Sequence, residues 1–135
     1  MIKVLTILGT RPEAIKLAPV LHELERDHET FESTVVATGQ HREMVDPMLE
    51  LFGIRPAFDL KLMRPGQNLD DITVGVLRGL RPILGQCAPD WMLVQGDTTS
   101  VMAAPTTWGS VPPLVSQQTT VSAPASAAAR RHCSA

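Results

Sequence analysis

Residues 2–24 read IKVLTILGTRPEAIKLAPVLHEL, and this stretch predicts a strand that passes directly into a helix. Its first part, Ile2 to Leu8, is a nearly continuous run of β-branched and aliphatic residues, which is typical of a strand buried on both faces of a parallel sheet. Gly9 ends this run. Thr10 and Glu13 follow at capping-box spacing, and apolar residues then recur at helical intervals. The predicted order is therefore strand, tight loop and amphipathic helix.

The same alternation continues along the chain. The further elements that we expect are strands over residues 33–37 and 91–94, a weak extended segment over 58–62, and helices over 42–52 and 69–84. Pro47 is expected to kink the first of these helices or to restart it after Asp46, and Pro82 is expected to perturb the second. Strands that alternate with helices predict an α/β fold with a doubly wound, Rossmann-like parallel sheet and right-handed crossovers.

The composition excludes several classes of function. The chain has 135 residues, with 12 basic and 14 acidic side chains, so it has no excess positive charge for nucleic acid or an anionic membrane surface. No apolar run approaches the ~20 residues that span a bilayer, and no signal peptide is recognisable. Cys87 and Cys133 are too few for a disulfide framework. We therefore expect a cytoplasmic protein with neither nucleic acid nor a membrane as its partner.

The composition changes abruptly near residue 104. All 14 carboxylates lie at or before Asp97, and the sequence from Ala103 onward is rich in Ala, Ser, Thr and Pro. We expect residues 1–104 to fold and residues 105–135 to be irregular and largely disordered. The sheet would then be unfinished, with an open edge at its last strand that invites self-association.

Ligands of such sheets bind beyond the carboxyl ends of the strands, which directs attention to residues 9–13, 38–41 and 95–99. Arg11 stands at the start of the first helix, where backbone N–H groups and the helix dipole favour an anion, and Lys16 can lean toward the same anion. An equally open alternative is that Arg11 pairs with Glu13 or with a neighbouring loop and that Lys16 is merely solvated.

Two other strand ends have polar residues with open roles. Asp97 follows a buried strand, where it can be a rigidly held catalytic carboxylate or simply a helix N-cap, and the pattern does not separate these roles. Gln40 and His41 form a polar group at the second strand end, although a lone loop histidine is more often a surface hydrogen-bonding residue. No second histidine stands at metal-ligand spacing, so no metal is expected.

Five blocks in the right order resemble one family. They are GTRPEAIKLAP (residues 9–19), TGQHREM (38–44), LFGI (51–54), PGQ (65–67) and QGDTT (95–99). Together they are similar to the N-terminal part of the bacterial, non-hydrolysing UDP-N-acetylglucosamine 2-epimerases, over about residues 1–104. Gln95 is a small departure, because the family usually has histidine there.

The resemblance implies a two-domain fold of the glycosyltransferase-B type, of which residues 1–104 are an incomplete N-terminal domain. It implies an isomerase that interconverts UDP-N-acetylglucosamine and UDP-N-acetylmannosamine by eliminating UDP and adding it back, for surface polysaccharide precursors and without a cofactor. Arg11 and Lys16 match substrate-contacting cations, and Asp97 matches a catalytic or substrate-binding carboxylate. Gln40, His41 and Gln67 match positions around a second, regulatory UDP-N-acetylglucosamine. Full-length relatives are expected to be homodimers.

After residue 104 the chain departs from the family. A glutamate-containing loop, further acid–base residues and the uridine-binding second domain have no counterpart, and a reading-frame shift near Ala104 is one explanation. The chain alone is therefore expected to be inactive. The alternatives are a non-enzymatic remnant that binds a nucleotide sugar weakly at most, and a glycosyltransferase half of the same fold, which would not be expected to have these loops.

Overall fold

The computed structural model describes residues 1–96, 114–115 and 119–122. Within them, a six-stranded sheet has the strand order β3-β2-β1-β4-β6-β5. Four strands and three helices alternate along the chain as β1 (Ile2–Leu8), α1 (Arg11–Arg26), β2 (Phe31–Ala37), α2 (Arg42–Leu51), β3 (Phe58–Asp59), α3 (Leu69–Cys87) and β4 (Trp91–Gln95). These four strands are parallel, with β1 paired to β2 on one side and to β4 on the other. The α/β prediction with a parallel sheet is confirmed.

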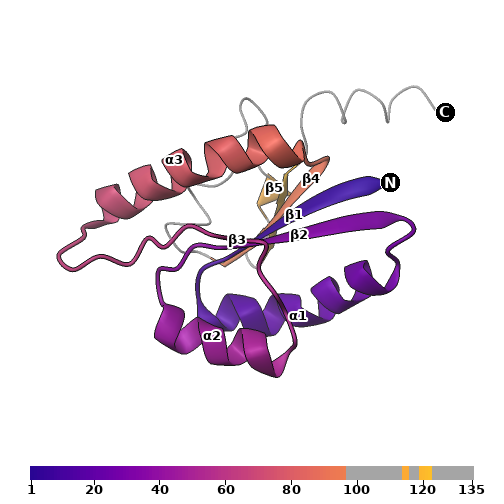
Figure 1. The fold of residues 1–135 in the computed structure, drawn as a ribbon, viewed down its shortest axis with the longest axis horizontal. Helices are drawn as coiled ribbons and strands as arrows, with labels where there is room; N and C mark the ends of the chain where they lie inside the picture. The colour runs from indigo at the N-terminus through magenta and orange to yellow at the C-terminus, as the bar shows by residue number, and fades with distance from the viewer. Residues whose placement is uncertain (97–113, 116–118, 123–135) are drawn as a thin grey trace.

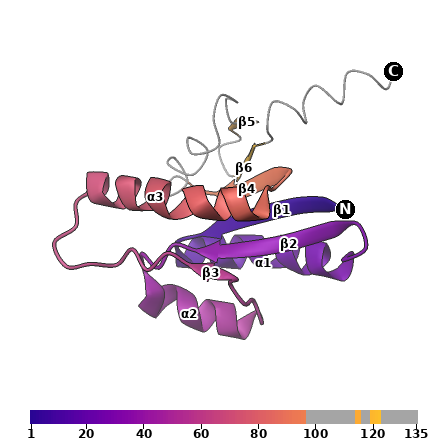
Figure 2. The ribbon, with the colours of Figure 1, turned by 45° about the horizontal axis from the view of Figure 1, so that its top comes forward.

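The helices cover both faces of this sheet. Figures 1 and 2 show α3 on one face and α1 and α2 on the other. Successive residues of a strand point to opposite faces, so Leu5 and Ile7 pack in the core beneath α3, whereas Val4 and Leu8 pack against α1 and α2. Both faces of β1 are buried, which explains its continuous apolar run.

Of the two outcomes expected at Pro47, the restart after Asp46 is wrong, whereas a kink there and a perturbation near Pro82 stay predictions. α2 continues through Pro47, and α3 continues through Pro82 to Cys87. In α2, the buried Val45 and Leu49 lie on either side of the exposed Pro47. A proline removes only one backbone hydrogen bond of a helix, and burial of the apolar stripe on both sides of it favours an uninterrupted helix.

Sequence reasoning also missed two short strands in the expected tail. β5 (Leu114–Val115) and β6 (Thr119–Ser122) pair with each other, and β6 pairs antiparallel with β4, from Met92 opposite Ser122 to Gln95 opposite Thr119. The expectation of an open edge at β4 is therefore wrong, because β6 supplies its neighbour. The rest of the predicted irregular tail lies outside the described residues.

Candidate functional site

A cavity of about 520 Å³ lies beyond the carboxyl ends of the parallel strands. We call it the site cavity; it is lined by Thr10, Arg11, Pro12, Glu13, Lys16, His41, Met44, Gln95 and Gly96. Its walls come from the loop and helix after β1, from the start of α2 after β2, and from the end of β4. This is the edge at which the fold class predicts a ligand.

Two cations reach the site cavity from α1. Arg11 is the first residue of the helix and Lys16 follows in its second turn, and both side chains are exposed. Within the described part of the chain, neither forms a salt bridge. The structure therefore brings the two predicted anion-binding residues to one cavity. Arg11 forms no ion pair with a carboxylate of the described residues.

Glu13 closes the loop between β1 and α1. Its side chain is only 2% exposed, and its Oε2 accepts hydrogen bonds from the backbone N–H groups of Gly9 at 2.6 Å and Thr10 at 2.9 Å. Pro12 has no backbone N–H to offer. The helix's own carboxylate therefore already binds the N–H groups of Gly9 and Thr10, and the bond to Thr10 is the one that the predicted capping box implies.

The end of β4 approaches this carboxylate closely. Gly96 has a φ of +107°, and a Cβ built on it would lie 3.3 Å from Oε1 of Glu13. A side chain at this position would therefore be both strained and crowded. Gln95, the residue before it, is 3% exposed and lines the site cavity. Asp97, the predicted catalytic carboxylate, is the next residue and lies outside the described ranges.

The second strand end supplies the opposite wall. His41 is the N-cap residue of α2 and lines the site cavity, and its ring makes no capping hydrogen bond to the helix. Gln40 lies beside it in the loop but is not among the cavity's lining residues. Arg42 is directed elsewhere, because its guanidinium pairs with Asp59 at 3.2 Å. Of this polar group, the structure places only His41 at the site cavity.

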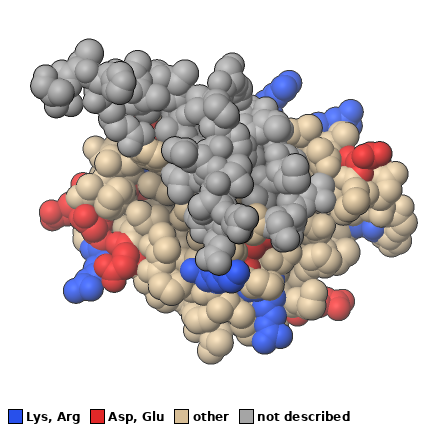
Figure 3. Space-filling model, turned by 180° about the vertical axis from the view of Figure 1, so that it is seen from behind, with Lys and Arg blue, Asp and Glu red and all other residues tan. Residues whose placement is uncertain are grey.

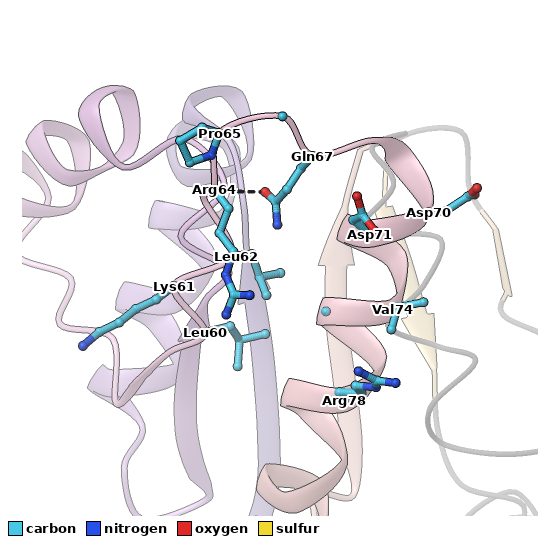
Figure 4. A pocket seen from close by; sticks show the side chains of 12 residues that line it. Leu60, Lys61, Leu62, Arg64, Pro65, Gln67, Asp70, Asp71, Val74 and Arg78 are labelled. Carbon is cyan, nitrogen blue, oxygen red and sulfur yellow. Dashed lines mark hydrogen bonds between the residues drawn. The ribbon is translucent and has the colours of Figure 1, made fainter.

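Gln67 lies in a different cavity. The larger hollow of about 630 Å³, which we call the loop cavity, is formed by the loop after β3 and the first turns of α3 (Figure 4). Oε1 of Gln67 accepts a hydrogen bond from the backbone N–H of Arg64 at 3.0 Å. The loop cavity is lined by Lys61, Arg64 and Arg78 and by Asp70 and Asp71, and sequence reasoning had assigned no role to these five residues.

The three residues predicted to surround a regulatory nucleotide sugar thus do not line one common cavity among the described residues. His41 lines the site cavity and Gln67 lines the loop cavity. Glu13 and Gln95 line the site cavity as well. The sequence had indicated Glu13 only as part of a capping box and Gln95 only as a departure from the family motif.

The surface and the remaining side chains add little further chemistry. Basic and acidic side chains are interspersed among the coloured residues of the face in Figure 3. In residues 1–96, 114–115 and 119–122, no cluster of three His, Cys, Asp or Glu could hold a metal ion. The helices of the same ranges are all too short or too polar to cross a bilayer.

Comparison with known proteins links this arrangement to one family. The family model described as UDP-N-acetylglucosamine 2-epimerase matches residues 22–107. The UDP-N-acetylglucosamine 2-epimerase of Yersinia pestis is 56% identical over 102 residues, which are 76% of this chain and 27% of that protein. The enzyme of Escherichia coli K12 is 55% identical over 101 residues, again 27% of its length. The chain therefore spans about a quarter of the length of these curated relatives.

Solved structures give the same result. The UDP-GlcNAc 2-epimerase of Neisseria meningitidis bound to UDP-GlcNAc has a TM-score of 0.72 and 49% identity, with 78% of this chain and 29% of that chain covered. The enzyme of Methanocaldococcus jannaschii in complex with UDP-GlcNAc and UDP has a TM-score of 0.71 and 30% identity, with the same coverage of both chains.

Proposed function

The chain belongs to the UDP-N-acetylglucosamine 2-epimerase family, and from this premise we propose that its site cavity forms one wall of a nucleotide-sugar site. In the full-length context of the family, that site would interconvert UDP-N-acetylglucosamine and UDP-N-acetylmannosamine, as precursors of surface polysaccharide. The cofactor-free reaction needs a base, an acid and groups that bind a diphosphate.

The proposed reaction proceeds by elimination and re-addition. A base removes the proton from C2 of the sugar while the C1–O bond to UDP breaks, which leaves 2-acetamidoglucal and UDP. UDP then adds back to C1, and C2 receives a proton on the opposite face. Both halves develop negative charge on the diphosphate, so cations held beside it stabilise the transition state more than the ground state.

The observation that best supports this proposal is the convergence of three side chains. Arg11, Lys16 and His41 line one cavity although they come from α1 and from the N-cap of α2, which are separate in sequence. Arg11 can bind phosphate oxygens in a bidentate manner, and Lys16 can bind them as a point charge. His41 can donate a hydrogen bond to a hydroxyl or phosphate oxygen. Asp97 stays a prediction for the acid–base step.

One wall is not sufficient for turnover. Positioning of the reacting groups supplies much of the rate enhancement of an enzyme, and the residues that the resemblance places in the second domain are not in this sequence. The 135-residue chain should therefore show no measurable epimerisation. A remnant that only binds a nucleotide sugar weakly is the second candidate function, and the short coverage of the relatives favours it for the isolated chain.

A chimera tests the proposal. Residues 1–104 of this chain would replace the matching segment of the Neisseria meningitidis epimerase, which is 51% identical over 102 residues. We expect the chimera to convert UDP-N-acetylglucosamine with uptake of solvent deuterium at C2, and the isolated chain to be inactive. A folded chimera without turnover would contradict the proposal, and turnover by the isolated chain would contradict the need for the second domain.

A further inference from the structure

We propose that Glu13 occupies the anion position of the β1–α1 loop from inside the protein, so that an anionic ligand binds to the side chains of Arg11 and Lys16 and not to the backbone of the loop. Glu13 is thus a positioning residue that decides where in the site cavity negative charge can lie. This inference rests on the proposed function for the identity of the ligand, a nucleoside diphosphate sugar.

Several backbone donors at the start of α1 already have acceptors inside the protein. A loop that leads from a strand into a helix usually offers several N–H groups to a phosphate. Here the N–H groups of Gly9 and Thr10 both donate to Oε2 of Glu13. The N–H of Ala14 donates to the carbonyl of Thr10, and Pro12 has none. The N–H groups of Gly9, Thr10 and Ala14 are therefore already bound.

The negative charge of Glu13 also disfavours a ligand phosphate near the loop backbone. The Glu13 carboxylate is buried in the wall of the site cavity and lies close to the end of β4, where a Cβ on Gly96 would lie 3.3 Å from Oε1. A ligand phosphate that approached the loop backbone would meet this carboxylate at short range, and like charges repel most strongly where solvent is excluded.

Arg11 and Lys16 supply the positive charge of the site cavity. Both line it and are exposed, whereas Glu13 is buried in its wall. A negative group is therefore attracted to the two exposed cations and repelled by the buried carboxylate. An extended diphosphate can contact both cations, whereas a single compact phosphate gains less, because it lacks the backbone cradle of a phosphate-binding loop.

Nuclear magnetic resonance of the 15N-labelled 135-residue chain tests this arrangement, with inorganic pyrophosphate as the probe. In the unmodified chain, pyrophosphate should shift the Nε–H resonance of Arg11 and leave the amides of Gly9 and Thr10 in place. Arg11→Gln should weaken its binding about tenfold. In Glu13→Ala the two amides are free, so they should shift on titration, and the affinity for inorganic phosphate should rise about tenfold.

Glu13→Gln is the matched variant. Its amide oxygen can still accept both hydrogen bonds, so the loop keeps its geometry and only the charge is lost. We expect pyrophosphate to bind about threefold more tightly to Glu13→Gln, without shifts at Gly9 or Thr10. This variant keeps the test decisive if Glu13→Ala does not fold.

Three results would overturn the inference: saturable shifts of Gly9 and Thr10 in the unmodified chain, unchanged or weaker pyrophosphate binding by Glu13→Gln, or no pyrophosphate binding that depends on Arg11. The probe contains neither uridine nor sugar. If the expected pyrophosphate pattern appears and the folded chimera does not turn over UDP-N-acetylglucosamine, the proposed function fails and the role of Glu13 stands.

Discussion

The two cavities of this molecule are built in different ways. Segments after three parallel strands form the site cavity, so the register of the sheet fixes their relative positions. One loop and one helix that are adjacent in sequence form the loop cavity. The first therefore depends on the whole sheet, whereas the second depends on the local path of residues 60–68.

Their charges differ as well. The site cavity has two cations without salt bridges to described residues and a carboxylate buried in its wall. The loop cavity mixes basic and acidic side chains that are all exposed. Two neighbouring cations can attract and orient an anion, whereas carboxylates interspersed among cations offset that attraction. We therefore propose that the reacting ligand binds in the site cavity.

Removal of the predicted acid–base group should have the largest effect. In the chimera that contains residues 1–104, Asp97→Asn should lower kcat by roughly 10²- to 10⁴-fold if this carboxylate transfers a proton. Steady-state kinetics with deuterium uptake at C2 measures it. A fully active Asp97→Asn chimera would leave Asp97 with the role of a helix N-cap.

A smaller effect, on stability, is expected at Gly39, where the loop after β2 contacts the segment after β3. Gly39 has a φ of +71°, and a Cβ on it would lie 2.8 Å from Oδ1 of Asp59 and 2.8 Å from Cα of Lys61. Lys61 lines the loop cavity, and Gly39 precedes the segment that supplies His41 to the site cavity. Gly39→Ala should therefore lower the free energy of unfolding by about 2–3 kcal/mol, because strain and a backbone clash add.

Gly53→Ala is the control for that experiment. Gly53 has a similar φ of +67°, but nothing lies within 4 Å of a Cβ built there. It should cost only the strain, about 1 kcal/mol. Urea unfolding of both variants separates strain from contact, and equal losses would show that the two loops are not packed together at Gly39.

The elements that were predicted correctly depend on local interactions, and those that were missed depend on contacts between residues far apart in sequence. The β1–α1 unit was predictable because Ile2 to Leu8 and the apolar stripe of α1 are local patterns with a regular period. The helix restart predicted after Asp46 failed because tertiary burial of Val45 and Leu49 outweighs one missing hydrogen bond. The pairing of β6 with β4 was not predicted for a similar reason, because no local sequence pattern indicates it.

The site shows the same limit. Arg11 and Lys16 were found from a helix start, which is local. Glu13 was recognised only as a cap, because its approach to Gly96 depends on the pairing of β1 with β4. The loop cavity was missed because residues 60–68 have no hydrophobic period, and only the packing of this loop against α3 creates the hollow.

Titration of the 135-residue chain with UDP-N-acetylglucosamine tests most directly whether the site cavity, and not the loop cavity, binds the nucleotide sugar. Arg11→Gln changes the site cavity, Gln67→Ala changes the loop cavity, and Arg26→Gln is a matched control at the far, exposed end of α1. We predict that Arg11→Gln weakens binding about tenfold, whereas Gln67→Ala and Arg26→Gln leave this affinity within about twofold. Loss of binding in Gln67→Ala with unchanged binding in Arg11→Gln would contradict the assignment.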